Sequence, residues 1–132
     1  MSVANVAVIC MPDRGHYQRM RPIIAGLHRL GASVSVFTHQ ALRGEIEQAG
    51  GTFADLFAHG TVEDTDDESW PLTVRFVTFA ARFAEPLARD VAASGASIVI
   101  GDTFAVIARA VANRLAVPYV NVCAGPAVVP DR

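Results

Sequence analysis

The chain has 132 residues, of which 52% are hydrophobic and 18% are charged, a length and balance typical of one compact globular domain. Its formal net charge is −2, so it lacks the basic excess with which proteins bind nucleic acid. All 11 basic residues are arginine, which excludes Schiff-base chemistry and a phosphate-loop lysine.

Apolar runs and cysteines carry information about location and redox state. No apolar run reaches the roughly 18 residues of a membrane span, and no positive segment followed by an apolar stretch opens the sequence. We therefore expect a cytoplasmic protein. Cys10 and Cys123 are too few and too far apart for a disulfide framework or a thiolate zinc site, so both are expected to be reduced and to pack as small hydrophobes.

The first elements predicted are a strand and a helix. An apolar, β-rich run over Val3–Cys10 predicts a buried strand, and a turn-rich stretch follows it. Apolar residues then recur at three- to four-residue spacing up to Gly31, which is typical of a helix that ends at a glycine. Because Pro22 lacks an N–H and strains a helix interior, we expect the regular helix to begin around Arg19, with His16 at or just before its entrance.

A strand, a helix and another strand are predicted next, at Ser33–Thr38, Ala41–Ala49 and Thr52–Phe57. The chain then turns polar from His59 to Ser69. The acidic residues of this segment are Glu63, Asp64, Asp66, Asp67 and Glu68. They lack the spacing and the glycine of a calcium loop, so we expect a solvated loop and no metal site.

A long helical pattern covers Pro71–Ser94, and Pro86 must kink this helix or split it in two. The last elements predicted are a strand at Ser97–Gly101, a helix at Phe104–Leu115 and a strand at Val117–Cys123. Strands that alternate with helices pair in parallel through right-handed connections. Residues 1–132 are therefore predicted to form a single α/β domain, a Rossmann-like doubly wound parallel sheet of about five strands in the order 3-2-1-4-5, with helices on both faces.

In that strand order, ligands bind beyond the carboxyl ends of strands 1 and 4. The loop after strand 1 contains His16, and the loop after strand 4 contains Asp102. A carboxylate that binds one imidazole nitrogen fixes the tautomer, which leaves the other nitrogen to take a proton from a substrate hydroxyl. The alternative interpretation is that Asp102 caps the helix that follows it and that His16 only ends a loop.

Substrate contacts are expected in the loops after strands 1, 4 and 5 and in the segment from Trp70 to Phe83. The candidate substrate-binding residues are Arg14, Gly15, Trp70, Phe76, Phe79, Phe83 and Thr103. Arg14 either binds a phosphate or carboxylate or is merely solvated. The three phenylalanines either line an apolar acceptor pocket or pack in the core, and core packing is favoured for at least two. Surface positions are expected for His28, His39 and His59.

Several cofactor signatures are missing from the sequence. Only Gly15 follows the first strand, so the three-glycine dinucleotide fingerprint is absent and a nicotinamide or flavin cofactor is disfavoured. The sequence also lacks a phosphate-binding P-loop, a Gly-x-Ser-x-Gly elbow and a His-Glu-x-x-His segment.

Nearly the whole chain resembles the N-terminal, acceptor-binding half of GT-B-type glycosyltransferases, the family that glycosylates macrolides, flavonoids and other small molecules. The resemblance is carried by Pro12–His16, Ile23–Leu27, Leu30–Thr38, Ile46–Gly51, Ile98–Asp102 and Ala112–Val120. One departure is at Arg19. Many members have a proline at this position, three residues after the histidine, whereas here the proline, Pro22, comes three residues later still. A second is that no counterpart of the C-terminal nucleotide-binding domain is present in these residues.

The resemblance implies that His16 is the general base that deprotonates the acceptor hydroxyl and that Asp102 is its partner. It also implies an inverting, metal-independent reaction with a nucleoside-diphosphate sugar, UDP- or TDP-linked, as donor. The expected partners are a small hydrophobic acceptor and a second, nucleotide-sugar-binding domain or subunit, with no cofactor held by this chain alone.

Three functional interpretations remain open. The favoured one is an acceptor-binding part of a glycosyltransferase, which would not transfer sugar efficiently alone because the donor site is missing. The second is a stand-alone protein that uses His16 and Asp102 for isomerisation or cyclisation of a small metabolite. The third is a non-catalytic subunit that completes a transferase in trans, and self-association is expected if an apolar interface is exposed.

Overall fold

The computed structural model describes residues 4–64 and 69–123. Its elements are β1 (Asn5–Ile9), α1 (Arg14–Arg29), β2 (Ser33–Thr38), the 3₁₀ helix η1 (Gln40–Leu42), α2 (Arg43–Ala49), β3 (Thr52–Asp55), the 3₁₀ helix η2 (Val62–Asp64), α3 (Leu72–Ala93), β4 (Ile98–Asp102), α4 (Val106–Leu115) and β5 (Tyr119–Val122). The five strands form one parallel sheet in the order β3-β2-β1-β4-β5. The predicted fold class and strand order are confirmed.

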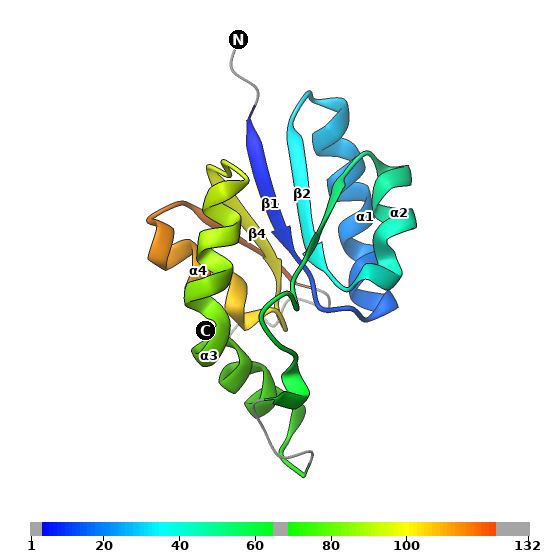
Figure 1. Ribbon diagram of the computed structural model, residues 1–132. Coiled ribbons are helices and arrows are strands. Elements are labelled where there is room, and N and C mark those ends of the chain that lie inside the picture. Colours follow the sequence, from blue (N-terminus) through cyan, green and yellow to red (C-terminus); the bar gives the residue numbers. More distant parts are fainter. Residues whose placement is uncertain (1–3, 65–68, 124–132) are drawn as a thin grey trace, which may run out of the picture.

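Helices cover both faces of the sheet, with α1 and α2 on one face and α3 and α4 on the other (Figure 1). Each face has its own hydrophobic cluster. Val6 and Val8 of β1 pack in the cluster that includes α1 and α2 residues, whereas Ala7 and Ile9 pack in the cluster that includes α3 and α4 residues. Because side chains alternate between the faces of a strand, a central strand covered on both sides must be apolar throughout.

Helix α1 begins five residues earlier than predicted, at Arg14 instead of Arg19. Asp13 is the N-cap, and its Oδ1 accepts a hydrogen bond from the Gly15 N–H at 2.7 Å. Pro22 therefore lies inside the helix, on its exposed side. The helix therefore starts at the Asp13 cap in spite of the proline in its interior. As a consequence, His16 lies within the first turn.

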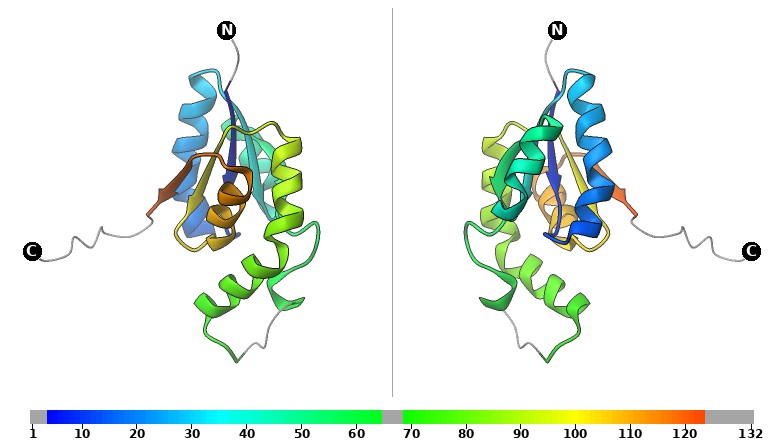
Figure 2. Two further views of the ribbon diagram at one scale, coloured as in Figure 1. Left: turned by 90° about the vertical axis from the view of Figure 1, so that its left-hand side faces the viewer. Right: turned by 90° about the vertical axis from the view of Figure 1, so that its right-hand side faces the viewer.

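Helix α3 is one continuous helix that contains Pro86. Figure 2 shows that its axis changes direction between its two halves, so the N-terminal half extends past the carboxyl ends of the strands. A proline ring clashes with the carbonyl one turn earlier and bends the helix there. Of the two outcomes predicted for Pro86, the structure has the kink.

The acidic segment after β3 is described only in part. Within it, Asp64 Oδ2 accepts hydrogen bonds from the Thr61 N–H at 2.8 Å and the Thr61 hydroxyl at 3.2 Å. The predicted loop residues Asp66, Asp67 and Glu68 lie outside the described residues. Within residues 4–64 and 69–123, no group of three or more His, Cys, Asp or Glu side chains is arranged to hold a metal ion. No helix in the same ranges has the length and apolar character needed to cross a bilayer.

Candidate functional site

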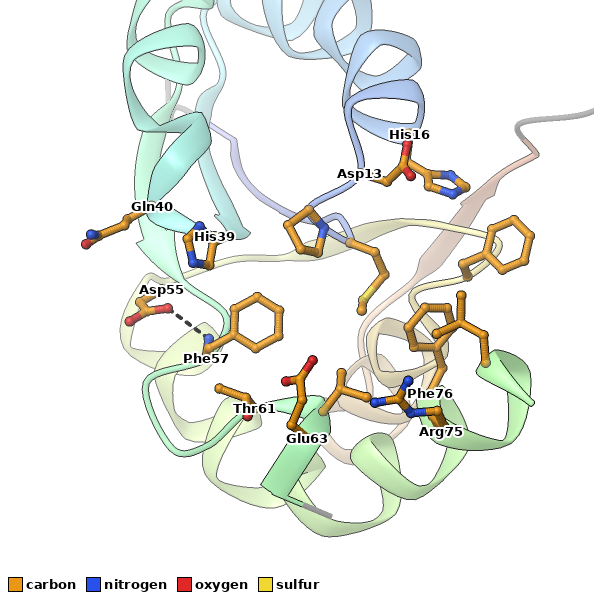
Figure 3. A pocket seen from close by; sticks show the side chains of 15 residues that line it. Asp13, His16, His39, Gln40, Asp55, Phe57, Thr61, Glu63, Arg75 and Phe76 are labelled. Carbon is orange, nitrogen blue, oxygen red and sulfur yellow. Dashed lines mark hydrogen bonds between the residues drawn. The ribbon is translucent and has the colours of Figure 1, made fainter. Parts of the chain in front are cut away.

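A cavity of about 670 Å³ opens at the carboxyl ends of the strands (Figure 3). Its walls come from the loops after β1, β2, β3 and β4, from the η2 segment and from the first turns of α3. The lining residues include Met11, Asp13, His16, His39, Phe57 and Phe76. Binding in an open α/β sheet is expected at this edge, and the volume lies in the range of sites for drug-sized molecules.

His16 occupies the first turn of α1 and lies half-buried at the wall of this cavity. Its ring meets that of Phe104 edge-on, with the ring centroids 4.8 Å apart. The Nδ1 atom is buried and has no hydrogen-bond partner within the described part of the chain. A buried imidazole nitrogen without a partner is costly, and it is a feature found where a structure serves binding or chemistry.

Asp102 is 1% exposed and binds backbone groups. Its Oδ1 accepts hydrogen bonds from the Phe104 N–H at 2.7 Å and the Ala105 N–H at 2.9 Å, and its Oδ2 accepts one from the Met11 N–H at 3.2 Å. The carboxylate thus ties the loop after β1 to the turn before α4. No hydrogen bond joins it to His16 among the described residues, so their role as a catalytic pair stays a prediction.

Cys10 lies beside Asp102 in the core and is fully buried. Burial raises the pKa of the Cys10 thiol far above its ordinary value, and the negative charge of Asp102 raises it further. The thiol donates a hydrogen bond to the Met11 carbonyl at 3.2 Å. Cys10 therefore stays protonated and packs as a small hydrophobe, as predicted, whereas Cys123 is exposed.

A second cavity, of about 390 Å³, also borders His16. Its lining includes Gly15, Arg19, Thr103 and Cys123, and it shares Asp13, His16 and Phe104 with the first cavity. His16 is thus accessible from two neighbouring spaces. Such an arrangement suits a group that acts between two reactants.

The predicted aromatic contacts divide between cavity and core. Phe76 lines the larger cavity. Phe79 and Phe83 are 1% and 9% exposed, pack against each other at 5.2 Å and line neither cavity. Trp70 is 44% exposed and lies outside both linings. For Arg14 only the backbone is described.

Several lining residues were missed by the sequence interpretation, which expected contacts only in the loops after β1, β4 and β5 and in the segment from Trp70 to Phe83. They are His39, Gln40, Asp55, Phe57, Thr61, Val62 and Glu63. Of these, His39 and Asp55 stand at the carboxyl ends of β2 and β3. The same edge rule, applied to every strand of the predicted sheet, would have pointed to both. Thr61 and Glu63 gave no such signal because they come from an irregular segment.

Solved structures of glycosyltransferases are similar to this chain. SnogD from Streptomyces nogalater matches with a TM-score of 0.77 and 19% identity, over 96% of this chain and 38% of that one. The spinosyn rhamnosyltransferase SpnG, complexed with spinosyn aglycone, matches with a TM-score of 0.74 and 21% identity, over 95% and 36%. The glycotransferase of kitacinnamycin matches with a TM-score of 0.75 and 16% identity, over 92% and 30%.

The likeness to these glycosyltransferases is one of fold. No family model matches the sequence, and no curated protein sequence matches it either. The chain spans about a third of the length of the structures named above. The expected likeness to a Rossmann-like part of GT-B glycosyltransferases is confirmed at the level of the fold.

Proposed function

We propose that this chain is the acceptor-binding part of an inverting glycosyltransferase that moves a sugar from a nucleoside-diphosphate donor to a hydroxyl of a small hydrophobic natural product. The observation that most supports this proposal is that His16, in the first turn of α1, borders two cavities at the carboxyl edge of the sheet. The fold shared with antibiotic glycosyltransferases supports the reaction class.

In the proposed reaction, His16 acts as general base. A neutral imidazole nitrogen takes the proton of the acceptor hydroxyl while the hydroxyl oxygen attacks the anomeric carbon. The new carbon–oxygen bond forms as the bond to the diphosphate breaks, and the diphosphate leaves with the electron pair. Attack from the side opposite the leaving group inverts the anomeric centre.

The lining of the larger cavity supports a hydrophobic acceptor with a few polar groups. Apolar side chains come from the loops after β1 and β3, from η2, from α3 and from the turn before α4, and they are Met11, Pro12, Phe57, Val62, Leu72, Phe76 and Phe104. Sites for small molecules combine such surfaces with a few placed polar groups. Here the polar lining residues are Asp13, His16, His39, Gln40, Asp55, Thr61, Glu63 and Arg75.

The donor requires more protein than this chain supplies. The SpnG structure is also known complexed with thymidine diphosphate, and this chain covers 36% of that protein. We therefore propose that a nucleotide-sugar-binding domain or subunit completes the site, with the reacting sugar beside His16. Bringing both reactants together is a large part of such catalysis.

The test compares His16→Gln with His28→Gln in the protein completed by the nucleotide-binding part that its natural gene or a neighbouring gene encodes. His28 is an exposed histidine of α1 outside both cavities. Loss of a general base is expected to lower kcat by about 100-fold or more with little change in acceptor KM, and the His28 variant is expected to behave like wild type.

Two outcomes would count against the proposal. Transfer that survives His16→Gln within about 3-fold, far less than a lost base costs, would remove His16 from the role of base. Turnover of a small metabolite by the 132-residue chain without any nucleotide sugar, abolished by the same substitution, would favour the stand-alone acid/base enzyme instead.

A further inference from the structure

His39 is a second histidine of the larger cavity, and it follows β2 directly. Its Nδ1 accepts a hydrogen bond from the Ala41 N–H at 3.0 Å, so the side chain caps the short helix η1. The His39 ring also lies 6.1 Å from the ring of Phe57, another lining residue. The imidazole is therefore held in place by a cap on one side and an aromatic neighbour on the other.

The cap determines where the imidazole carries its proton. A nitrogen that accepts a hydrogen bond has its lone pair available and no hydrogen, so neutral His39 must carry its proton on Nε2. No hydrogen bond in residues 4–64 and 69–123 uses that Nε2–H. His39 consequently offers the cavity a donor and no acceptor.

The two histidines lie on opposite sides of the cavity. Figure 3 shows His39 beyond the end of β2 and His16 on the first turn of α1, with lining side chains between them. The proposed base must accept a proton from the reacting hydroxyl, whereas His39 can only donate. A molecule that spans the cavity would thus meet an acceptor at one side and a donor at the other.

We propose that His39 is a specificity-determining residue, whose Nε2–H binds a carbonyl oxygen of the acceptor molecule at the side of the cavity remote from His16. This inference rests on the proposed function for the identity of the reacting hydroxyl. It favours acceptors that are hydrophobic and carry a hydroxyl at one end and a strongly accepting oxygen, that of a carbonyl group, at the other. His39 is exposed, so with molecules that lack the carbonyl its Nε2–H is left to water, and the complex loses one hydrogen bond.

The experiment measures equilibrium binding of two probes to the 132-residue chain. 7-Hydroxyflavone carries a hydroxyl and a ring carbonyl, and 7-hydroxyflavan has a closely similar skeleton without the carbonyl. The wild-type chain is expected to bind the flavone about 5-fold more tightly, the worth of one hydrogen bond. Because binding requires no sugar transfer, this readout is independent of the test of His16.

The variant His39→Ser isolates the donor. Serine is a good N-cap residue, so its hydroxyl can still accept from the Ala41 N–H, but its short side chain carries no group to the position of Nε2. We expect this variant to keep its fold by circular dichroism and to bind both probes equally. The matched control, His28→Ser, is expected to keep the wild-type preference for the flavone.

Equal binding of the two probes to the wild-type chain, including no measurable binding of either, would overturn the assignment. So would a preference for the flavone that survives His39→Ser, or ¹⁵N NMR spectra that place the proton of neutral His39 on Nδ1. If the flavone preference depends on His39 while His16→Gln leaves sugar transfer intact, the proposed base is wrong and the His39 contact stands.

Discussion

The place of Asp102 at the carboxyl end of β4 could be predicted from the sequence, but its hydrogen-bond partners could not. The strand pattern and the edge rule locate it opposite the loop after β1. Its oxygens, however, bind three backbone N–H groups, from Met11, Phe104 and Ala105. Such pairings depend on the paths of two loops, and local sequence carries no periodic signal for those paths.

Asp102 is expected to stabilise the fold through these three backbone hydrogen bonds. In Asp102→Ala the three backbone donors lose their acceptor in a buried place, and the free energy of unfolding is expected to fall by about 3 kcal/mol. In Asp102→Asn the amide oxygen can replace Oδ1, so a loss of about half that size is expected. Urea denaturation of the three proteins gives both values. Equal stability of wild type and Asp102→Ala would mean that these backbone bonds contribute nothing.

At the scale of elements, sequence patterns located the helices and strands but not the start of α1. The proline rule for Pro22 favoured a late start, and the Asp13 cap favoured an early one. The cost of Pro22 is opposed by the Asp13 cap and by the buried face of α1, to which Tyr17, Met20 and Ile24 belong. The consequence for the site is direct, because the early start puts His16 in a rigid helical turn.

The packing of α4 on β4 depends on a residue without a side chain. A Cβ at Gly101 would lie 2.5 Å from the Cβ of Ala108, closer than two such atoms can approach. The small residues Gly101 and Ala108 thus allow α4 to lie close to β4. Because Asp102 is the next residue of the same strand, this packing also helps to position the turn at the cavity.

Gly101→Ala is therefore expected to destabilise the protein by about 1–3 kcal/mol through overpacking. The matched control is Gly44→Ala in α2, where a Cβ would have no neighbour within 4 Å. There, alanine is expected to stabilise the helix by about 0.5–1 kcal/mol. Thermal and urea unfolding of both variants checks the opposite signs. A neutral Gly101→Ala would show that α4 can shift away from the sheet without loss.

For the whole molecule, strand alternation and right-handed crossovers predicted the sheet order, because few arrangements satisfy both. The strand order alone did not predict the size of the cavity or the residues of its wall. The wall is shaped by the bend of α3, which follows from Pro86, and by the segment from Phe57 to Asp64, whose path depends on long-range packing. An example is Gly60, where a Cβ would strike the ring of Phe83.

The fold also leaves apolar side chains exposed near the projecting half of α3. Trp70, Leu72, Val74 and Val77 are 44%, 55%, 43% and 53% exposed. Leu72 lines the larger cavity, whereas Val74 and Val77 are three residues apart on one side of the helix and form what we call the α3 patch. Single exposed hydrophobic residues are ordinary, but a group of them on one projecting element is typical of a surface that contacts another molecule. The similar glycosyltransferases are about three times as long as this chain, which is consistent with such a contact.

We therefore expect the 132-residue chain to self-associate through the α3 patch as its concentration rises from micromolar to millimolar. Val77→Glu places a charge within the patch and is expected to weaken association ~10-fold or more, because a buried charge without a partner costs over 1.4 kcal/mol. Gln48→Glu adds the same charge on exposed α2, beyond the sheet from α3, and is expected to change little. Sedimentation velocity across the concentration range measures all three proteins, and a wild-type chain that stays monomeric throughout would contradict an interface at the α3 patch.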